Sequence, residues 1–153
     1  MLRLIKYLLT LSVLFVFCSC SAPEDNTKKE VIVPDKITML FVTQPSCPSC
    51  DKLEETMELS RPKALLNKYF NIKKVYLGEK LPDGLVEPNG TPTVYFLGAN
   101  NEILVEPMVG EKEEEGLIEF LEDALLEFKN IYQVDLIEKI KHQKCKENNE
   151  TIN

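Results

Sequence analysis

The sequence lacks the features that mark nucleotide-binding and nucleic-acid-binding proteins. Its six glycines do not gather into a phosphate-binding loop, and no stretch combines a basic patch with interleaved aromatic side chains. Acidic side chains outnumber basic ones by 25 to 18, which gives a formal net charge of −7. A phosphate backbone would be repelled overall, so we expect no nucleic-acid partner.

The chain also has no apolar run long enough to cross a membrane. The run from Tyr7 to Phe17 spans roughly 11 residues, whereas a spanning helix needs about 17–25. Because Arg3 and Lys6 precede it, the run is typical of an export signal. The polar stretch that follows it predicts a flexible tether.

The end of this signal resembles the processing site of bacterial lipoproteins. Cys20 follows the small residue Ser19, although Phe17 stands where that family usually has leucine. The resemblance implies a signal peptide over residues 1–19, a lipid on Cys20 and a tether over residues 20–35. It places the protein in the bacterial cell envelope, lipid-anchored to a membrane and facing the periplasm or the exterior. A plain secretory signal that is cleaved nearby is the alternative.

The remainder is long enough for one domain with a hydrophobic core, since 44% of the 153 residues are hydrophobic. Its pattern predicts strands over residues 37–43, 71–78, 91–98 and 102–110, and helices over residues 46–57, from near Ser60, 112–129 and, more weakly, 131–146. The last two strands should form a hairpin, with Pro107 placing the fourth strand at an edge or a bulge. This order predicts a compact α/β sandwich with a mixed sheet.

Exported chains meet oxidising surroundings, which gives the five cysteines a context. Cys47 and Cys50 lie where the first strand ends and a helix is expected to begin, with Ser46 as its capping residue and Pro48 in its first turn. A helix N-terminus favours a thiolate, so we expect Cys47 to be the exposed nucleophile and Cys50 to lie deeper. Asp51, about one turn away, opposes the thiolate.

The motif SCPSC after a buried strand, followed by GTPTVYFLG at residues 90–98, resembles the thioredoxin superfamily. The resemblance implies a thioredoxin-like sandwich over residues 36–129, with a mixed central β-sheet flanked by helices, and a C-terminal helical extension and tail over residues 130–153. It also implies a cis bond between Thr91 and Pro92, in a loop that binds the extended substrate chain.

Two departures from thioredoxins proper narrow this resemblance. The chain has no tryptophan, and Ser46 occupies the place of the one before the first cysteine. Phe41 stands where the family buries an acid that accepts the proton of the second cysteine, so that proton must pass through water or another group. The chain is therefore most similar to exported, membrane-tethered thioredoxin-like lipoproteins.

The resemblance implies a thiol–disulfide oxidoreductase, more readily a protein-disulfide reductase than an oxidant, with Cys47 and Cys50 as catalytic residues. Pro48 and Ser49 would modulate the pair. We expect a monomer without a cofactor, whose partners are client proteins with cysteines or disulfides. A membrane thiol electron carrier would recharge it, because no glutathione pool is expected outside the membrane.

Three alternatives stay open from the sequence. Cys47, Cys50, His142 and Cys145 could form a tetrahedral zinc site. The pair could be a permanent disulfide, although so short a loop stabilises little. The chain could also be a non-catalytic thioredoxin-fold module that holds a partner or a metal. In the redox interpretation, Cys145 is a spare thiol on the C-terminal tail.

Overall fold

The computed structural model of the protein describes residues 32–142. The predicted signal peptide, the lipidation residue Cys20, most of the predicted tether and Cys145 lie outside the described residues. Within the described part, no helix is long and apolar enough to cross a membrane.

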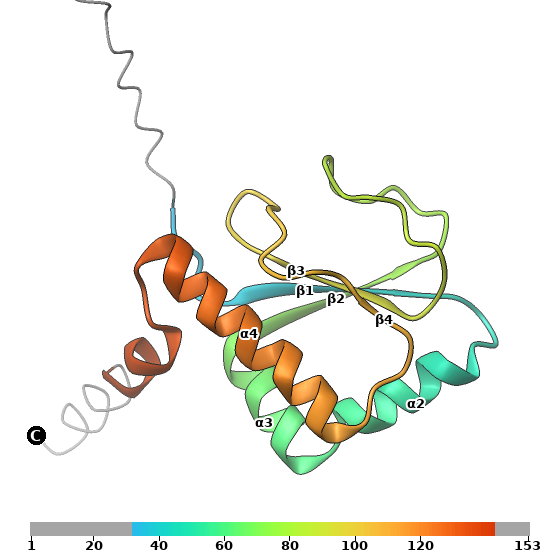
Figure 1. The fold of residues 1–153 in the computed structure, drawn as a ribbon, viewed down its shortest axis with the longest axis horizontal. Helices are drawn as coiled ribbons and strands as arrows, with labels where there is room; N and C mark the ends of the chain where they lie inside the picture. The colour runs from blue at the N-terminus through green and yellow to red at the C-terminus, as the bar shows by residue number, and fades with distance from the viewer. Residues whose placement is uncertain (1–31, 143–153) are drawn as a thin grey trace, which may run out of the picture. The chain divides into compact units, whose positions relative to one another are not determined.

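A mixed four-stranded sheet forms the centre of the fold, as predicted (Figure 1). Its strands are β1 (Ile37–Thr43), β2 (Phe70–Tyr76), β3 (Thr93–Leu97) and β4 (Met108–Val109), in the order β2-β1-β3-β4. β1 runs parallel to β2 and antiparallel to β3. Because neighbours cover both edges and both faces of β1, its sequence is a nearly continuous apolar run.

Three helices cover one face of this sheet (Figure 1). They are α2 (Pro48–Met57), α3 (Ser60–Tyr69) and α4 (Glu114–Tyr132). Alternate residues of each strand point toward them: Met39 and Phe41 from β1 and Phe96 from β3 lie in one core cluster with the buried residues of the helices. The main core therefore lies between the sheet and the helix layer.

The opposite face of the sheet is covered by the loop over residues 77–92 (Figure 1). Leu81 of this loop packs on Leu40 of β1 and Tyr95 of β3. The Tyr95 hydroxyl donates a 2.7 Å hydrogen bond to the carbonyl of Val86, which holds the loop in place. A loop without helix thus provides the second layer, and it leads directly into the Thr91–Pro92 segment.

The predicted helix restart near Arg61 and Pro62 is confirmed. α2 ends at Met57, and α3 begins at Ser60, with Pro62 in its first turn, where proline is tolerated. The fourth strand is shorter than predicted: only Met108–Val109 forms a ladder with β3, apart from an isolated bridge between Leu97 and Ile103. Its predicted edge position is confirmed.

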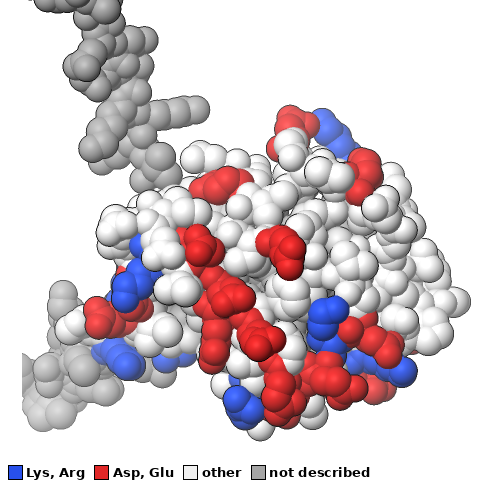
Figure 2. Space-filling view, viewed as in Figure 1, with Lys and Arg blue, Asp and Glu red and all other residues white. Residues whose placement is uncertain are grey.

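The amphipathic helix predicted over residues 112–129 is confirmed as α4, which continues to Tyr132. Its apolar side is buried, and Figure 2 shows acidic side chains gathered along its outer side. Gln133 ends it in a left-handed conformation, and a further helical segment begins at residue 136. Leu136, only 2% exposed, belongs to the main core, so the start of the predicted extension packs on the domain.

Candidate active site

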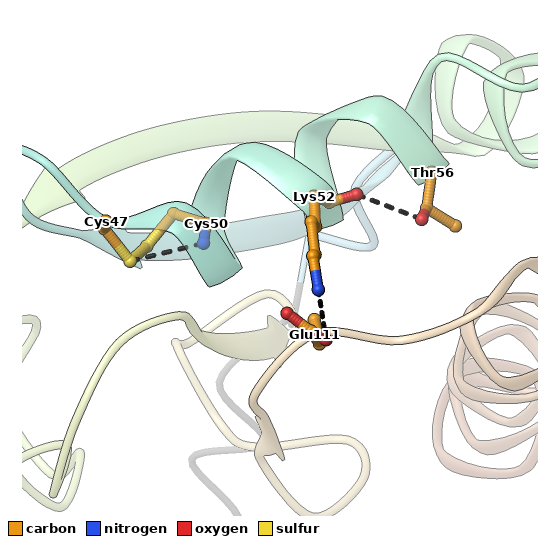
Figure 3. Close-up of polar contacts among 5 residues, drawn as sticks. All are labelled: Cys47, Cys50, Lys52, Thr56 and Glu111. Atoms are coloured by element: carbon orange, nitrogen blue, oxygen red, sulfur yellow. Dashed lines mark hydrogen bonds and ion pairs between the residues drawn. A yellow bond between two sulfur atoms is a disulfide. The ribbon is translucent and has the colours of Figure 1, made fainter.

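The cysteine pair lies at the junction between the sheet and the helix layer. β1 ends at Thr43, a four-residue turn follows, and α2 begins directly after Cys47. Cys47 and Cys50 form a disulfide, with an S–S distance of 2.07 Å and a Cα–Cα distance of 5.2 Å (Figure 3). The spacing of three therefore places both sulfur atoms on the first helical turn, as the sequence predicted.

Cys47 itself caps helix α2, which corrects the assignment of Ser46 as the capping residue. The backbone N–H of Cys50 points at Cys47 Sγ over 3.2 Å and at the Cys47 carbonyl over 3.0 Å. Ser46 has a φ of 57°, so it forms the turn before the helix. Pro48 occupies the first helical position, where its missing N–H costs nothing, and Ser49 follows it, half-buried.

Both cysteines are buried, which corrects the expectation that Cys47 would be exposed. Cys47 is 6% exposed and Cys50 is 1% exposed, and both belong to the main core cluster. The predicted order of depth is nevertheless right. Little of Cys47 is therefore open to solvent, and still less of Cys50.

The Thr91–Pro92 segment lies beside Cys47, and its peptide bond is cis, as the resemblance implied. Thr91 Oγ1 is 3.5 Å from Cys47 Sγ. A disulfide sulfur has no proton, so the threonine hydroxyl is the donor. With the N–H of Cys50, two donors therefore point at Cys47 Sγ. In the reduced protein both would favour the thiolate, in the same direction as the helix dipole.

Two contacts hold the frame around this segment. The N–H of Gly110, directly after β4, donates a 2.9 Å hydrogen bond to the Pro92 carbonyl. Lys52 Nζ of α2 lies 3.1 Å from Glu111 Oε1, so an ion pair joins the cysteine helix to the loop after β4 (Figure 3). Among the described residues, neither the N–H nor the C=O of Thr91 has a backbone hydrogen-bond partner.

Sequence reasoning missed a charged pair beside the site. Lys74 lies opposite Phe41 in the register of β2 and β1, and its ammonium is 5.7 Å from the centre of the Phe41 ring. Lys74 Nζ also lies 2.5 Å from Glu54 Oε1 of α2, and this hydrogen bond raises the pKa of Lys74. Only the strand register brings the two residues together, so no local pattern could have indicated the pair.

The zinc alternative requires a residue that the structure does not describe. Within residues 32–142, no group of three or more His, Cys, Asp or Glu side chains is placed to hold a metal ion. His142 is exposed near the end of the described part, and Cys145 lies outside it. The four-residue site therefore cannot be assembled from the described residues alone.

No protein-family model matches this sequence, and no curated protein is significantly similar to it. Among solved structures, it is similar to the periplasmic thioredoxin SoxS from Paracoccus pantotrophus, with 18% identity and a TM-score of 0.46 over 58% of this chain and 99% of that one. A disulphide isomerase from Xylella fastidiosa Temecula1 is 20% identical, with a TM-score of 0.48 over 57% of this chain and 77% of that one. A thioredoxin from Thermus thermophilus is 21% identical, with a TM-score of 0.48 over 57% of this chain and 72% of that one.

The fold assignment depends on the geometry of this chain. A mixed sheet with a parallel β1–β2 pair and an antiparallel hairpin supports a helix layer on one face. A disulfide at the start of α2 lies against a cis-proline loop from a distant part of the chain. Together these features give the protein a thioredoxin-like α/β fold.

Proposed function

We propose that this protein is a thiol–disulfide oxidoreductase that exchanges the Cys47–Cys50 disulfide with client proteins. One observation carries the proposal: Cys47 caps helix α2, and two hydrogen-bond donors, the N–H of Cys50 and the hydroxyl of Thr91, point at Cys47 Sγ. This arrangement favours a thiolate at the more accessible cysteine. A disulfide that served only as a staple would need neither donor.

The exchange proceeds in two steps when the protein acts as a reductant. The Cys47 thiolate attacks one sulfur of a client disulfide, forms a mixed disulfide, and displaces the other client sulfur as a thiolate that takes up a proton. Cys50 then loses its proton and attacks Cys47 Sγ, which forms the Cys47–Cys50 disulfide and releases the second client thiolate. Two electrons pass to the client, and the sulfur atoms carry them without a cofactor.

The same site offers backbone groups to a client chain. The N–H and C=O of Thr91 have no backbone partner among the described residues, and Thr91 is half-buried beside Cys47. An extended client chain could hydrogen-bond to both groups and so place its disulfide at Cys47 Sγ. This arrangement supports the assignment of Thr91 and Pro92 to substrate binding.

The setting of the reaction follows from the sequence. The N-terminal pattern supports export, lipidation of Cys20 and a position in the bacterial cell envelope, tethered to a membrane. We favour the reductant direction. A membrane thiol electron carrier would then return the pair to the dithiol state, and clients would be envelope proteins with disulfides.

A trapping experiment in the native envelope tests the proposal. The Cys50→Ser variant of the full chain should hold clients as mixed disulfides on Cys47, because the second thiol of the pair, which would release them, is absent. The Cys47→Ser/Cys50→Ser variant is the matched control and should capture nothing. If the double variant fully replaces the wild-type chain in cells while Cys50→Ser traps no client, the protein is a binding module and the exchange proposal is wrong.

A further inference from the structure

The second step of the proposed exchange needs a route for one proton. Cys50 must lose its proton before it attacks Cys47 Sγ, yet Cys50 is only 1% exposed, so water and buffer have little access to it. The strand beneath it, β1, has no titratable side chain in its sequence ITMLFVT. The group that carries the proton must therefore come from another element.

Glu54 is placed to carry this proton. It follows Cys50 by four residues on α2, so the two side chains are neighbours on the helix surface. Side chains in a helix lean toward its N-terminus, which directs Glu54 back toward Cys50. Its side chain is 43% exposed. One carboxylate can therefore face both the buried cysteine and the solvent.

Lys74 holds this carboxylate on the side of α2 that faces the site. Its Nζ lies 2.5 Å from Glu54 Oε1 and 5.7 Å from the centre of the Phe41 ring. Phe41 packs in the same core cluster as Cys47 and Cys50. The ion pair therefore lies against a residue of the core cluster that contains the cysteines, while both of its side chains stay partly exposed to solvent.

The other charged groups near α2 have different partners or positions. On α2 itself, Asp51 is exposed and near enough to Lys74 to contribute to its raised pKa. Asp51 is adjacent to Cys50 in the chain, and residues one apart do not face each other on a helix. Tyr76 is a further titratable side chain of β2 near Lys74. Ion pairs of α2 and its neighbouring elements include Lys52–Glu111, Lys63–Glu58, Arg61–Glu114 and Arg61–Glu115.

We propose that Glu54 carries the proton between Cys50 and the solvent, with Lys74 as the residue that positions its carboxylate. In the resolving step, the Cys50 thiol gives its proton to the Glu54 carboxylate, and the resulting thiolate attacks Cys47 Sγ. The client thiolate leaves, and the proton passes from Glu54 to solvent or to that thiolate. Glu54 thus replaces the acid that is absent at Phe41. This inference rests on the proposed function.

Two-phase kinetics can test the role of Glu54. We would use the full chain with Cys18, Cys20 and Cys145 changed to serine, so that only the pair carries thiols. Mixing the reduced protein with an excess of a chromogenic aromatic disulfide releases one coloured thiol when Cys47 attacks. It releases a second when Cys50 resolves the mixed disulfide. The Cys50→Ser variant identifies the second phase, because it lacks that phase.

We expect Glu54→Gln to slow the second phase by about tenfold at neutral pH. This is below the roughly 10²–10⁴-fold contribution of a fully enclosed general base, because water that reaches the half-exposed Glu54 side chain can take over part of its role. The deficit should shrink as the pH rises, because hydroxide can then remove the proton of Cys50. Glu54→Asp, which keeps a carboxylate, should retain more of the rate than Glu54→Gln. Glu55→Gln, with the same charge change on the exposed side of α2, should match the wild type.

Three outcomes would overturn this inference in different ways. If Glu54→Gln and Glu55→Gln resolve at the same rate across the pH range, the proton leaves Cys50 by another route, while the exchange function stands. If the wild-type chain shows no first phase, Cys47 does not react with disulfides and the proposed function itself is wrong. A deficit that high pH does not relieve would show that Glu54 has only a structural role.

Discussion

The contact between Thr91 and Cys47 predicts how strongly the site stabilises the nucleophile. Changing Thr91 to valine keeps the shape of the side chain but removes the hydroxyl that lies 3.5 Å from Cys47 Sγ. Hydrogen bonds to charged groups contribute roughly 1.5–3 kcal/mol. We take about 1 kcal/mol here, because the contact is long and Thr91 is only half-buried.

This magnitude gives a measurable change in reactivity. A loss of about 1 kcal/mol lowers the fraction of Cys47 thiolate about fivefold, because 1.4 kcal/mol corresponds to a factor of ten. The remaining thiolate is more nucleophilic, with a Brønsted coefficient of about 0.4–0.5, so the net rate of alkylation at low thiolate fraction should fall about two- to threefold. Once Cys47 is fully ionised in both proteins, the variant should react slightly faster than the wild type.

Alkylation rates of the reduced chain over a range of pH would test whether the rate profiles of Thr91→Val and the wild type cross in this way. Thr56→Val is the matched control, because Thr56 is remote from the pair and its hydroxyl donates only to the Lys52 carbonyl within α2. The reduction potential of Thr91→Val should also become more negative by about 20 mV where Cys47 is ionised, since 30 mV corresponds to about 1.4 kcal/mol for two electrons. Coincident profiles for Thr91→Val, Thr56→Val and the wild type would refute the assignment of the Thr91 hydroxyl as a thiolate donor.

Two further predictions concern stability and use urea unfolding. Leu53→Ala removes a side chain of the core that is 0% exposed, and it should lower the free energy of unfolding by about 2–5 kcal/mol. The control Leu126→Ala, at a 54% exposed position, should change the free energy of unfolding by less than about 0.5 kcal/mol. Equal effects of the two substitutions would contradict the burial of Leu53. Asp135 accepts hydrogen bonds from the N–H groups of Ile137 and Glu138, so Asp135→Ala should cost about 1 kcal/mol at neutral pH. The hydrogen bond from Lys129, followed by these backbone bonds, lowers the pKa of Asp135. The stabilisation by Asp135 is therefore present above the ordinary carboxyl pKa and is lost as the pH falls through the lower pKa of the folded state. A stability difference between wild type and Asp135→Ala that persists in stronger acid would refute the linkage.

Local patterns were sufficient for most of the elements. The apolar run over residues 37–43 predicted β1 with its correct bounds, and the Arg61-Pro62 step predicted the restart of the helix at Ser60. The fourth strand was overestimated. Its residues alternate well enough for a strand, but the chain leaves the ladder after Ile103 and returns only for Met108–Val109. Pairing over that stretch depends on how the turn and Pro107 place the backbone, which a local pattern does not encode.

In the candidate site, too, local sequence predicted some features, and others depend on tertiary packing. The spacing of Cys47 and Cys50 at a helix start predicted their pairing. The sequence placed Ser46 at the cap and Cys47 in solvent, whereas Cys47 is the cap and is 6% exposed. Cys47 packs in the main core cluster and contacts Thr91, 44 residues further along the chain. The accessibility of a side chain is a property of all its neighbours, which a local pattern does not contain.

The sequence by itself therefore determined the helix and strand periods, the cysteine pair and its place at a helix N-terminus, because these depend on residues close together in the chain. Only the tertiary structure decided which distant groups meet the pair. The Thr91 hydroxyl reaches Cys47 because β3 lies antiparallel beside β1. Lys74 reaches Glu54 because the register of β2 on β1 sets it opposite Phe41, beneath α2. Strand register is fixed by long-range pairing and core packing, and these contacts supply the chemistry of the site.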